Sequence, residues 1–274
     1  MRRASCRPSC LRALFSAAAC AAAVALASEG AAAQPGARYE GCERDGAYSA
    51  RRNVDVDARG ARRLVVEARA GTLRVRGVDG LAQVRVRGTA CASRQALLDE
   101  IRLVARRDGD AVVVRAEIPE RRDGWDGGWN DDGVRALDLV LEVPRGIAAD
   151  VVDGSGALEI RGVGALDVTD GSGEIRLEDV GPTRVEDGSG EIEVRDVRGD
   201  LRVADGSGGI VARRVRGSVT VERDGSGGID VQEVAGDLTV ERSRGRGIAY
   251  ADVRGRVTVP RNGRDEWRRR RAWY

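Results

Sequence analysis

Histidine and lysine are absent from the 274 residues, and aromatic side chains make up only 3% of them, with a single Phe. Without His, the chain has no imidazole for acid and base catalysis or for a mixed Cys/His zinc site. With so few aromatics, any core is built from Val, Leu, Ile and Ala. A core in which Val leads is typical of strands.

Because Lys is missing, all 46 basic residues are Arg, as expected of a GC-rich coding bias, which weakens any functional interpretation of Arg as such. Removing residues 1–33 takes away four Arg and one Glu, so 42 basic residues remain against 43 acidic ones, a net charge of −1. A nearly neutral chain with interspersed signs argues against a nucleic-acid partner.

Residues 1–33 have the anatomy of a secretory signal peptide. Four Arg come first, an apolar run follows from Leu11 to Ala27, and small residues end at Ala33. This order predicts export, with a mature chain that begins near Gln34 in the periplasm, at the cell surface or outside the cell. Cleavage after Ala27 and lipidation at Cys20 are the alternatives.

Export would leave two cysteines, Cys42 and Cys91. An even number in an oxidising compartment predicts one disulfide between them, which would stabilise the fold by about 4 kcal/mol in the chain-entropy model. The alternative is a pair of buried thiols. Two cysteines without His make a poor zinc site.

Residues 34–63 are predicted to be a polar N-terminal segment, and residues 64–149 a β-rich lead-in to the repeats described below. Apolar residues in the lead-in follow the same template as those repeats and predict an isolated upstream copy: Leu73, Val75, Val78, Val84 and Val86. Residues 92–100 could form a short helix, but residues 101–104 and 111–114 favour a hairpin.

Two segments carry all four tryptophans. A Gly- and Asp-rich loop at 123–133 contains Trp125 and Trp129, and an Arg-rich tail at 261–274 contains Trp267 and Trp273. The loop could bind a sugar ring, a protein or calcium, but a plain exposed insert is favoured. The tail is expected to cap the last repeat or to be disordered, with contact to an anionic membrane surface as the alternative.

The most informative feature is Asp-Gly-Ser-Gly, which occurs five times, with spacings of 17, 17, 18 and 19 residues, followed by a degenerate copy at 244–247. Such a period indicates stacked structural repeats, here over residues 150–260. We predict that these residues form the repeat turns: Asp153, Gly154, Gly156, Asp170, Gly171, Gly173, Asp187, Gly188, Gly190, Asp205, Gly206, Gly208, Asp224, Gly225 and Gly227.

Aligning the copies gives five apolar columns, of which the first contains Leu158, Ile175, Ile192, Ile210, Ile229 and Ile248. Within a copy the apolar positions alternate with polar ones, which is the period of a strand with one buried face. Each copy therefore contains about two short strands, and like residues stack in parallel. We predict an all-β, single-chain β-solenoid, a parallel β-helix-like fold with right-handed winding as the default.

Outward positions fit the same register. Glu159, Arg176 and Glu193 alternate in sign along one column, which relieves repulsion between stacked charges. The five repeat aspartates do not alternate. We interpret them as outward turn residues that accept hydrogen bonds from the turn amides that follow. A row of calcium ions is the alternative, but one Asp per repeat gives few oxygen ligands.

The repeat unit, as in Val203 to Val221, resembles the bacterial "putative adhesin" family of β-strand-repeat domains of unknown function. The resemblance covers about residues 64–260 and implies an exported β-solenoid with an adhesion or surface-interaction role. The family brings no catalytic residues, and the tryptophan loop and the tail are departures from it.

The sequence offers no catalytic cluster, cofactor motif or metal motif. We therefore expect a non-enzymatic binding or structural module whose partner is an envelope or surface component, either glycan or protein. The alternative is a carbohydrate-active β-helix enzyme that acts on polysaccharide, since Asp and Arg on one face can support such chemistry.

Overall fold

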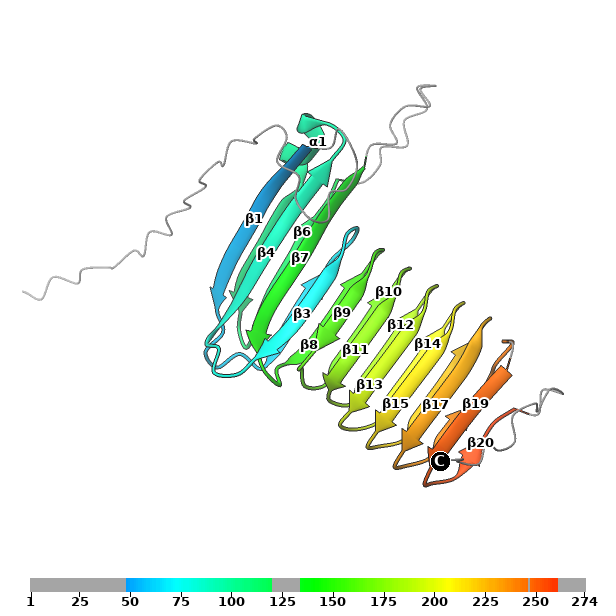
Figure 1. The fold of residues 1–274 in the computed structure, drawn as a ribbon. Coiled ribbons are helices and arrows are strands. Elements are labelled where there is room, and N and C mark those ends of the chain that lie inside the picture. The colour runs from blue at the N-terminus through cyan, green and yellow to red at the C-terminus, as the bar shows by residue number, and fades with distance from the viewer. Residues whose placement is uncertain (1–47, 120–133, 246, 261–274) are drawn as a thin grey trace, which may run out of the picture. The chain divides into compact units, whose positions relative to one another are not determined.

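The computed structural model describes residues 48–119, 134–245 and 247–260, and its strands form two ten-stranded sheets that enclose one apolar core (Figure 1). Sheet A contains, in spatial order, β1 (Tyr48–Asp57), β4 (Gln83–Ala92), β7 (Arg135–Pro144), β3 (Leu73–Val78), β9 (Leu158–Arg161), β11 (Ile175–Val180), β13 (Ile192–Val197), β15 (Ile210–Val215), β17 (Gly228–Val234) and β19 (Gly247–Val253). Sheet B contains β20 (Val257–Thr258), β18 (Leu238–Val240), β16 (Val219–Asp224), β14 (Leu201–Asp205), β12 (Thr183–Asp187), β10 (Leu166–Asp170), β8 (Ala148–Asp153), β2 (Arg63–Glu67), β6 (Ala111–Glu117) and β5 (Arg102–Asp108).

The repeats form the predicted β-solenoid. Each copy, called a rung here, places one strand in each sheet, and strands of successive rungs pair in parallel with equivalent residues opposite one another. Ile192, for example, pairs with Ile175 on one side and Ile210 on the other, and all three are fully buried. Each such apolar side chain contributes about 1.5–3 kcal/mol through burial. Right-handed winding stays a prediction.

Glycine makes the close stacking of the turns possible. Gly190 has a φ of 146°, which side-chain-bearing residues rarely adopt, and a Cβ there would overlap the carbonyl oxygen of Gly173 on the rung before. Gly188, two residues earlier, has no positive φ, but a Cβ on it would overlap the carbonyl oxygen of Gly171. The two glycines of the motif are thus required for different reasons: one for conformation and space, the other for space alone.

The solenoid begins earlier than the predicted boundary at residue 150, which falls inside β8. Strand β2 pairs in parallel with β8, and β3 pairs in parallel with β9, so residues 63–78 form a rung in line with the repeats. Leu73 and Val75 occupy the predicted column position, since they pair with Leu158 and Ile160.

Val84 and Val86 do not belong to that rung, although they fit its template. They lie on β4, which is antiparallel to both β1 and β7 in sheet A. The template fits because an alternating strand buries every second residue whichever way it runs. Similarly, residues 48–57 of the segment predicted to be polar form β1, whose partner is β4.

Both alternatives for residues 92–117 are realised. Gln95–Glu100 form helix α1, and β5 and β6 then form an antiparallel hairpin. Leu98 anchors the helix in the core, while the guanidinium of Arg52 donates to the carbonyl oxygens of Leu98 and Ile101 at 3.2 and 3.1 Å. These bonds satisfy carbonyls that a helix end leaves open.

Candidate functional site

The five repeat aspartates form a continuous column, called the aspartate column here. Asp153, Asp170, Asp187, Asp205 and Asp224 lie opposite one another in neighbouring strands of sheet B. Their side chains are at most 4% exposed, so the interpretation of these residues as outward-facing is wrong. The strand alternation explains the difference: Asp170 follows the buried Val168 by two residues and so points to the same side.

The predicted turn bonds are present at three of the five aspartates, Asp153, Asp187 and Asp205. Asp187 Oδ1 accepts from the amide of Ser189 at 3.2 Å, and Asp205 Oδ1 accepts from that of Ser207 at 3.0 Å. The second oxygen of each of these three carboxyls is buried and finds no hydrogen-bond partner among the described residues, and both oxygens of Asp170 lack one. These buried carboxyls are therefore at most half satisfied, which disfavours their charged form.

Burial raises the pKa of Asp153, Asp187 and Asp205 to about 6 and also raises that of Asp170. The charge of the neighbouring rung adds to this effect, as that of Asp170 does for Asp187. Because neighbouring carboxyls of the column repel one another when charged, each makes ionisation of the next less favourable.

The aspartate column presents one carboxyl per rung. Within the described ranges, no group of three or more His, Cys, Asp or Glu side chains is placed to hold a metal ion.

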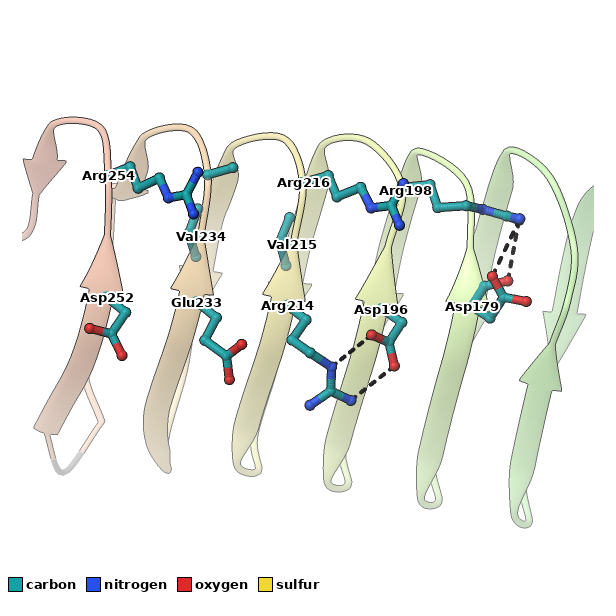
Figure 2. Close-up of a pocket in the computed structure, with 11 residues that line it drawn as sticks. Asp179, Asp196, Arg198, Arg214, Val215, Arg216, Glu233, Val234, Asp252 and Arg254 are labelled. Atoms are coloured by element: carbon teal, nitrogen blue, oxygen red, sulfur yellow. Dashed lines mark hydrogen bonds and ion pairs between the residues drawn. The ribbon is translucent and has the colours of Figure 1, made fainter. Parts of the chain in front are cut away.

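An open groove of about 600 Å³ lies on the outer surface where the strands of sheet A end, and Figure 2 shows its charged side chains. It is called the charged groove here. Its lining comes from β11, β13, β15, β17, β19 and the turns that follow them: Asp179, Asp196, Arg198, Arg214, Val215, Arg216, Glu233, Val234, Ala235, Asp252 and Arg254.

One row of the groove, called the bulge row, results from a backbone irregularity that recurs in each rung. Its members have φ values between 53° and 58°, unusual for residues other than glycine: Asp179, Asp196, Arg214, Glu233 and Asp252. The parallel pairing skips them, so that Glu178 pairs with Arg195 and Val180 with Val197. This left-handed residue, called a bulge here although each strand keeps the same number of residues, lets two polar side chains in succession point outward before the next Val turns inward.

The second row, called the turn row, contains Arg198, Arg216 and Arg254 (Figure 2). Ala235 follows β17 and takes the equivalent place between the last two. Arg198 and Arg216 each follow a buried Val that ends a strand of sheet A, and Arg254 follows the partly buried Val253. Since the rungs repeat, the guanidinium groups line up along the solenoid above the bulge row. The groove therefore has a cationic side and a mainly acidic side.

Near the middle of the solenoid, the groove neutralises its own charges. Arg214 donates two hydrogen bonds to Asp196, at 2.7 and 2.9 Å, which lower the pKa of that carboxyl. Arg198 lies 3.3 Å from Asp179 and donates to the Val163 carbonyl at 2.6 Å. These side chains are held in place within the fold.

Toward β19 the pattern changes. The side chains of Arg216, Glu233, Asp252 and Arg254 have no hydrogen-bond or ion-pair partner among the described residues. Charged side chains held in rows by a rigid scaffold, with their bonding capacity unused, are available to an external ligand. This end of the groove is the strongest candidate for a binding site.

The predicted alternation of charge on sheet A is confirmed. Arg176 pairs in register with Glu159 and Glu193, and its Nε lies 3.6 Å from the Glu193 carboxylate. The charges of these three residues therefore offset one another along sheet A.

Several predicted residues lie outside the described ranges: Trp125, Trp129, Trp267, Trp273 and Cys42, together with the signal peptide, the loop at 123–133 and the tail. Cys91 is buried on β4, and its disulfide with Cys42 stays a prediction. Among the described residues, no helix is long and apolar enough to cross a membrane.

Sequence reasoning missed the charged groove. The signal was a break in the alternation, where two polar residues precede each buried Val, as in Arg195-Asp196-Val197 and Gln232-Glu233-Val234. Such a doublet places a bulge at a fixed position of each rung.

No family model matches the sequence, and no curated protein matches it. The chain is similar to a putative cell adhesion protein from Clostridium sporogenes (11% identity, TM-score 0.31, 77% of this chain and 98% of that one). It is also similar to a putative lipid binding protein from Parabacteroides distasonis (14%, 0.34, 77% and 97%) and to a putative adhesin from Parabacteroides merdae (9%, 0.35, 77% and 96%).

Proposed function

We propose that the chain is an exported, adhesin-like, non-enzymatic binding module of the periplasm or cell surface, and that the charged groove is its binding surface. The observation that carries the proposal is a set of four charges toward β19 that have no hydrogen-bond or ion-pair partner among the described residues: Arg216, Glu233, Asp252 and Arg254. Arg214 and Asp196 act on two of them, Glu233 and Arg216, at longer range. The term adhesin-like is based on the resemblance of the repeats, and export is based on the signal peptide predicted for residues 1–33.

The scaffold supports this role. Continuous parallel pairing on both sides of β15 and β17 fixes the backbone of the groove, so a ligand would meet side chains that are already in place. Such preorganisation lowers the entropy lost on binding. The sides of the groove repeat from rung to rung, which suits a partner that also repeats.

Binding is tested with the exported protein on a glycan array and on immobilised envelope proteins. We expect retention of at least one component, and loss of that retention in a variant with Arg216→Ala, Glu233→Gln, Asp252→Asn and Arg254→Ala. A matched variant on sheet B, Arg202→Ala with Arg223→Ala, is expected to bind as the wild type does. Equal retention by the groove variant and the wild type would overturn the assignment of this surface.

The non-enzymatic part of the proposal is tested on the same ligands. Glu233 and Asp252 occupy adjacent rungs, and paired carboxylates are the machinery of glycoside hydrolysis. We expect binding without release of reducing ends. Turnover of a polysaccharide that Glu233→Gln or Asp252→Asn abolishes would establish the enzyme alternative instead.

Export is tested by cell fractionation of the native protein and of a form that lacks residues 1–33. We expect only the native form outside the cytoplasm, with an intact mass that corresponds to cleavage before Gln34. Retention of the native form in the cytoplasm would contradict the localisation.

A further inference from the structure

We propose that the charged groove binds an acidic oligosaccharide that lies along the solenoid, with its carboxylates on Arg216 and Arg254 and its hydroxyl groups on Glu233 and Asp252. The inference rests on the proposed function and specifies its ligand class. It follows from the spacing of the two rows, from their opposite charge and from what the groove lacks.

The spacing of the turn row suits a polymer with regularly placed anions. Arg216 follows β15 and Arg254 follows β19, and β17 lies between these strands. Two steps of a parallel sheet place equivalent backbone positions about 10 Å apart. Ala235, which follows β17, occupies the place between the two arginines and carries only a methyl side chain.

The chemistry of the turn row suits carboxylates. A guanidinium presents a planar fork that binds a carboxylate through two parallel hydrogen bonds. Arg214 makes this arrangement with Asp196 inside the same groove, so the local geometry admits it. Arg216 and Arg254 offer the same fork with no partner from the described chain.

The bulge row supplies hydrogen-bond acceptors for the hydroxyl groups of a sugar polymer. Glu233 and Asp252 lie on adjacent rungs, with carboxylates that accept hydrogen bonds and donate none. Sugar hydroxyl groups are donors that suit such acceptors. Both residues keep a left-handed backbone, with φ of 58° and 54°, that glycine would adopt without strain.

The same two carboxylates disfavour a dense polyanion. Nucleic acid or polyphosphate would place negative charge against Glu233 and Asp252 and would offer them few donors. An acidic oligosaccharide instead separates its charges by neutral, hydroxyl-bearing positions. The acidic row therefore selects for sparse anions.

A peptide fits the groove less well. Its apolar lining consists of Val215, Val234 and Ala235, and the first two are only 1% exposed, so the groove offers no pocket for an anchoring side chain. The backbone of β15 and β17 is paired on both sides, which leaves no open edge for an added strand.

Isothermal titration of the exported wild-type chain with three acidic probes tests the proposal: hexamers of galacturonate and mannuronate, and a hyaluronan oligosaccharide. A cellohexaose of similar length is the neutral probe. We expect binding of at least one acidic probe. Its affinity should fall at least tenfold in the variant with Arg216→Ala and Arg254→Ala, and also when NaCl is raised from 50 to 500 mM. Binding of the neutral probe is expected to be at least tenfold weaker.

Two controls separate charge at the site from charge in general. Arg202→Ala with Arg223→Ala removes the same charge from exposed positions of sheet B and is expected to leave affinity within twofold of wild type. The variant with Glu233→Gln and Asp252→Asn is expected to bind the acidic hexamer with severalfold lower affinity and polyphosphate with higher affinity. Thermal unfolding verifies that each variant is folded.

The outcomes distinguish the two proposals. If no acidic probe binds, or if the groove arginine variant binds one unchanged, the ligand class is wrong. If neutral glycans or a protein are then retained through the groove, the proposed function still stands. If no array component depends on the groove residues, both proposals fall.

Discussion

Asp187 and Asp205 lie opposite each other on neighbouring strands of sheet B, and both side chains are buried. Each carboxyl uses one oxygen to accept from a turn amide and leaves the other without a partner among the described residues. The charge of Asp187 raises the pKa of Asp205 further, after burial itself. The turn that defines the repeat therefore also places like charges in a column.

The aspartate column makes the free energy of unfolding depend on pH. The pKa of Asp187 and Asp205 is about 6 in the folded protein and 3.8 in an unperturbed side chain, so the folded state binds more protons between these values. Stability should therefore fall as pH rises from about 4 to 6 and level off above that. Urea unfolding between pH 4.5 and 8 measures this, and a rise in stability over the window would contradict it.

Asp187→Asn should stabilise the protein at pH 7.5, by about 1–2 kcal/mol, because the amide keeps the acceptor for Ser189 and removes a buried charge. The same variant should flatten the pH dependence. Asp167→Asn changes an exposed carboxyl of the neighbouring rung and serves as the control, with an expected effect within about 0.5 kcal/mol. A loss of stability in Asp187→Asn at pH 7.5 would show that the column favours its charged form.

Calcium should not raise the melting temperature beyond the effect of ionic strength. One carboxyl per rung supplies fewer oxygens than the six to eight that calcium takes. Thermal unfolding in calcium chloride is compared with that in magnesium chloride of equal ionic strength. A saturable stabilisation at low millimolar calcium, specific for that ion, would restore the alternative of a calcium row.

Gly208→Ala should destabilise the protein by at least about 3 kcal/mol or prevent folding, since it combines a strained φ with overlap of the new Cβ and the Gly190 carbonyl oxygen. The adjacent Gly209 is the matched control. Its nearest neighbours would lie 4.0 Å from an added Cβ, and Gly209→Ala should change stability by about 0.5 kcal/mol or less. Similar effects of the two substitutions would contradict the stacking of the turns.

Glu233→Gly should stabilise the fold by about 0.5–1 kcal/mol, because glycine adopts the left-handed conformation at this bulge without steric strain. Gln232→Gly, one residue earlier in the regular part of the strand, should instead destabilise by about 1 kcal/mol. Chemical denaturation of both variants gives the comparison. If Glu233→Gly destabilises, the side chain contributes contacts that outweigh the backbone strain.

The solenoid was predictable because its signals are local and repeated. Alternation within each copy defines a strand, and the return of the same pattern after 17 to 19 residues defines the stacking, so that the pairing of Ile175, Ile192 and Ile210 could be expected. The lead-in was harder. Val84 and Val86 alternate as the repeats do, and alternation does not encode strand direction, so the antiparallel β4 could not be told from a parallel rung.

The sequence by itself determined the strand pattern, the turn residues and the register, because a two-residue period and a constant repeat length leave one arrangement that buries every apolar column. Only the tertiary structure decided which polar residues face inward and which gather outside. Asp170 is buried because the alternation continues past the last apolar residue of its strand, and Arg216 and Glu233 enter one groove because a bulge recurs at the same place in each rung. Both outcomes depend on how a strand ends at a corner, and residue spacing alone does not specify that geometry.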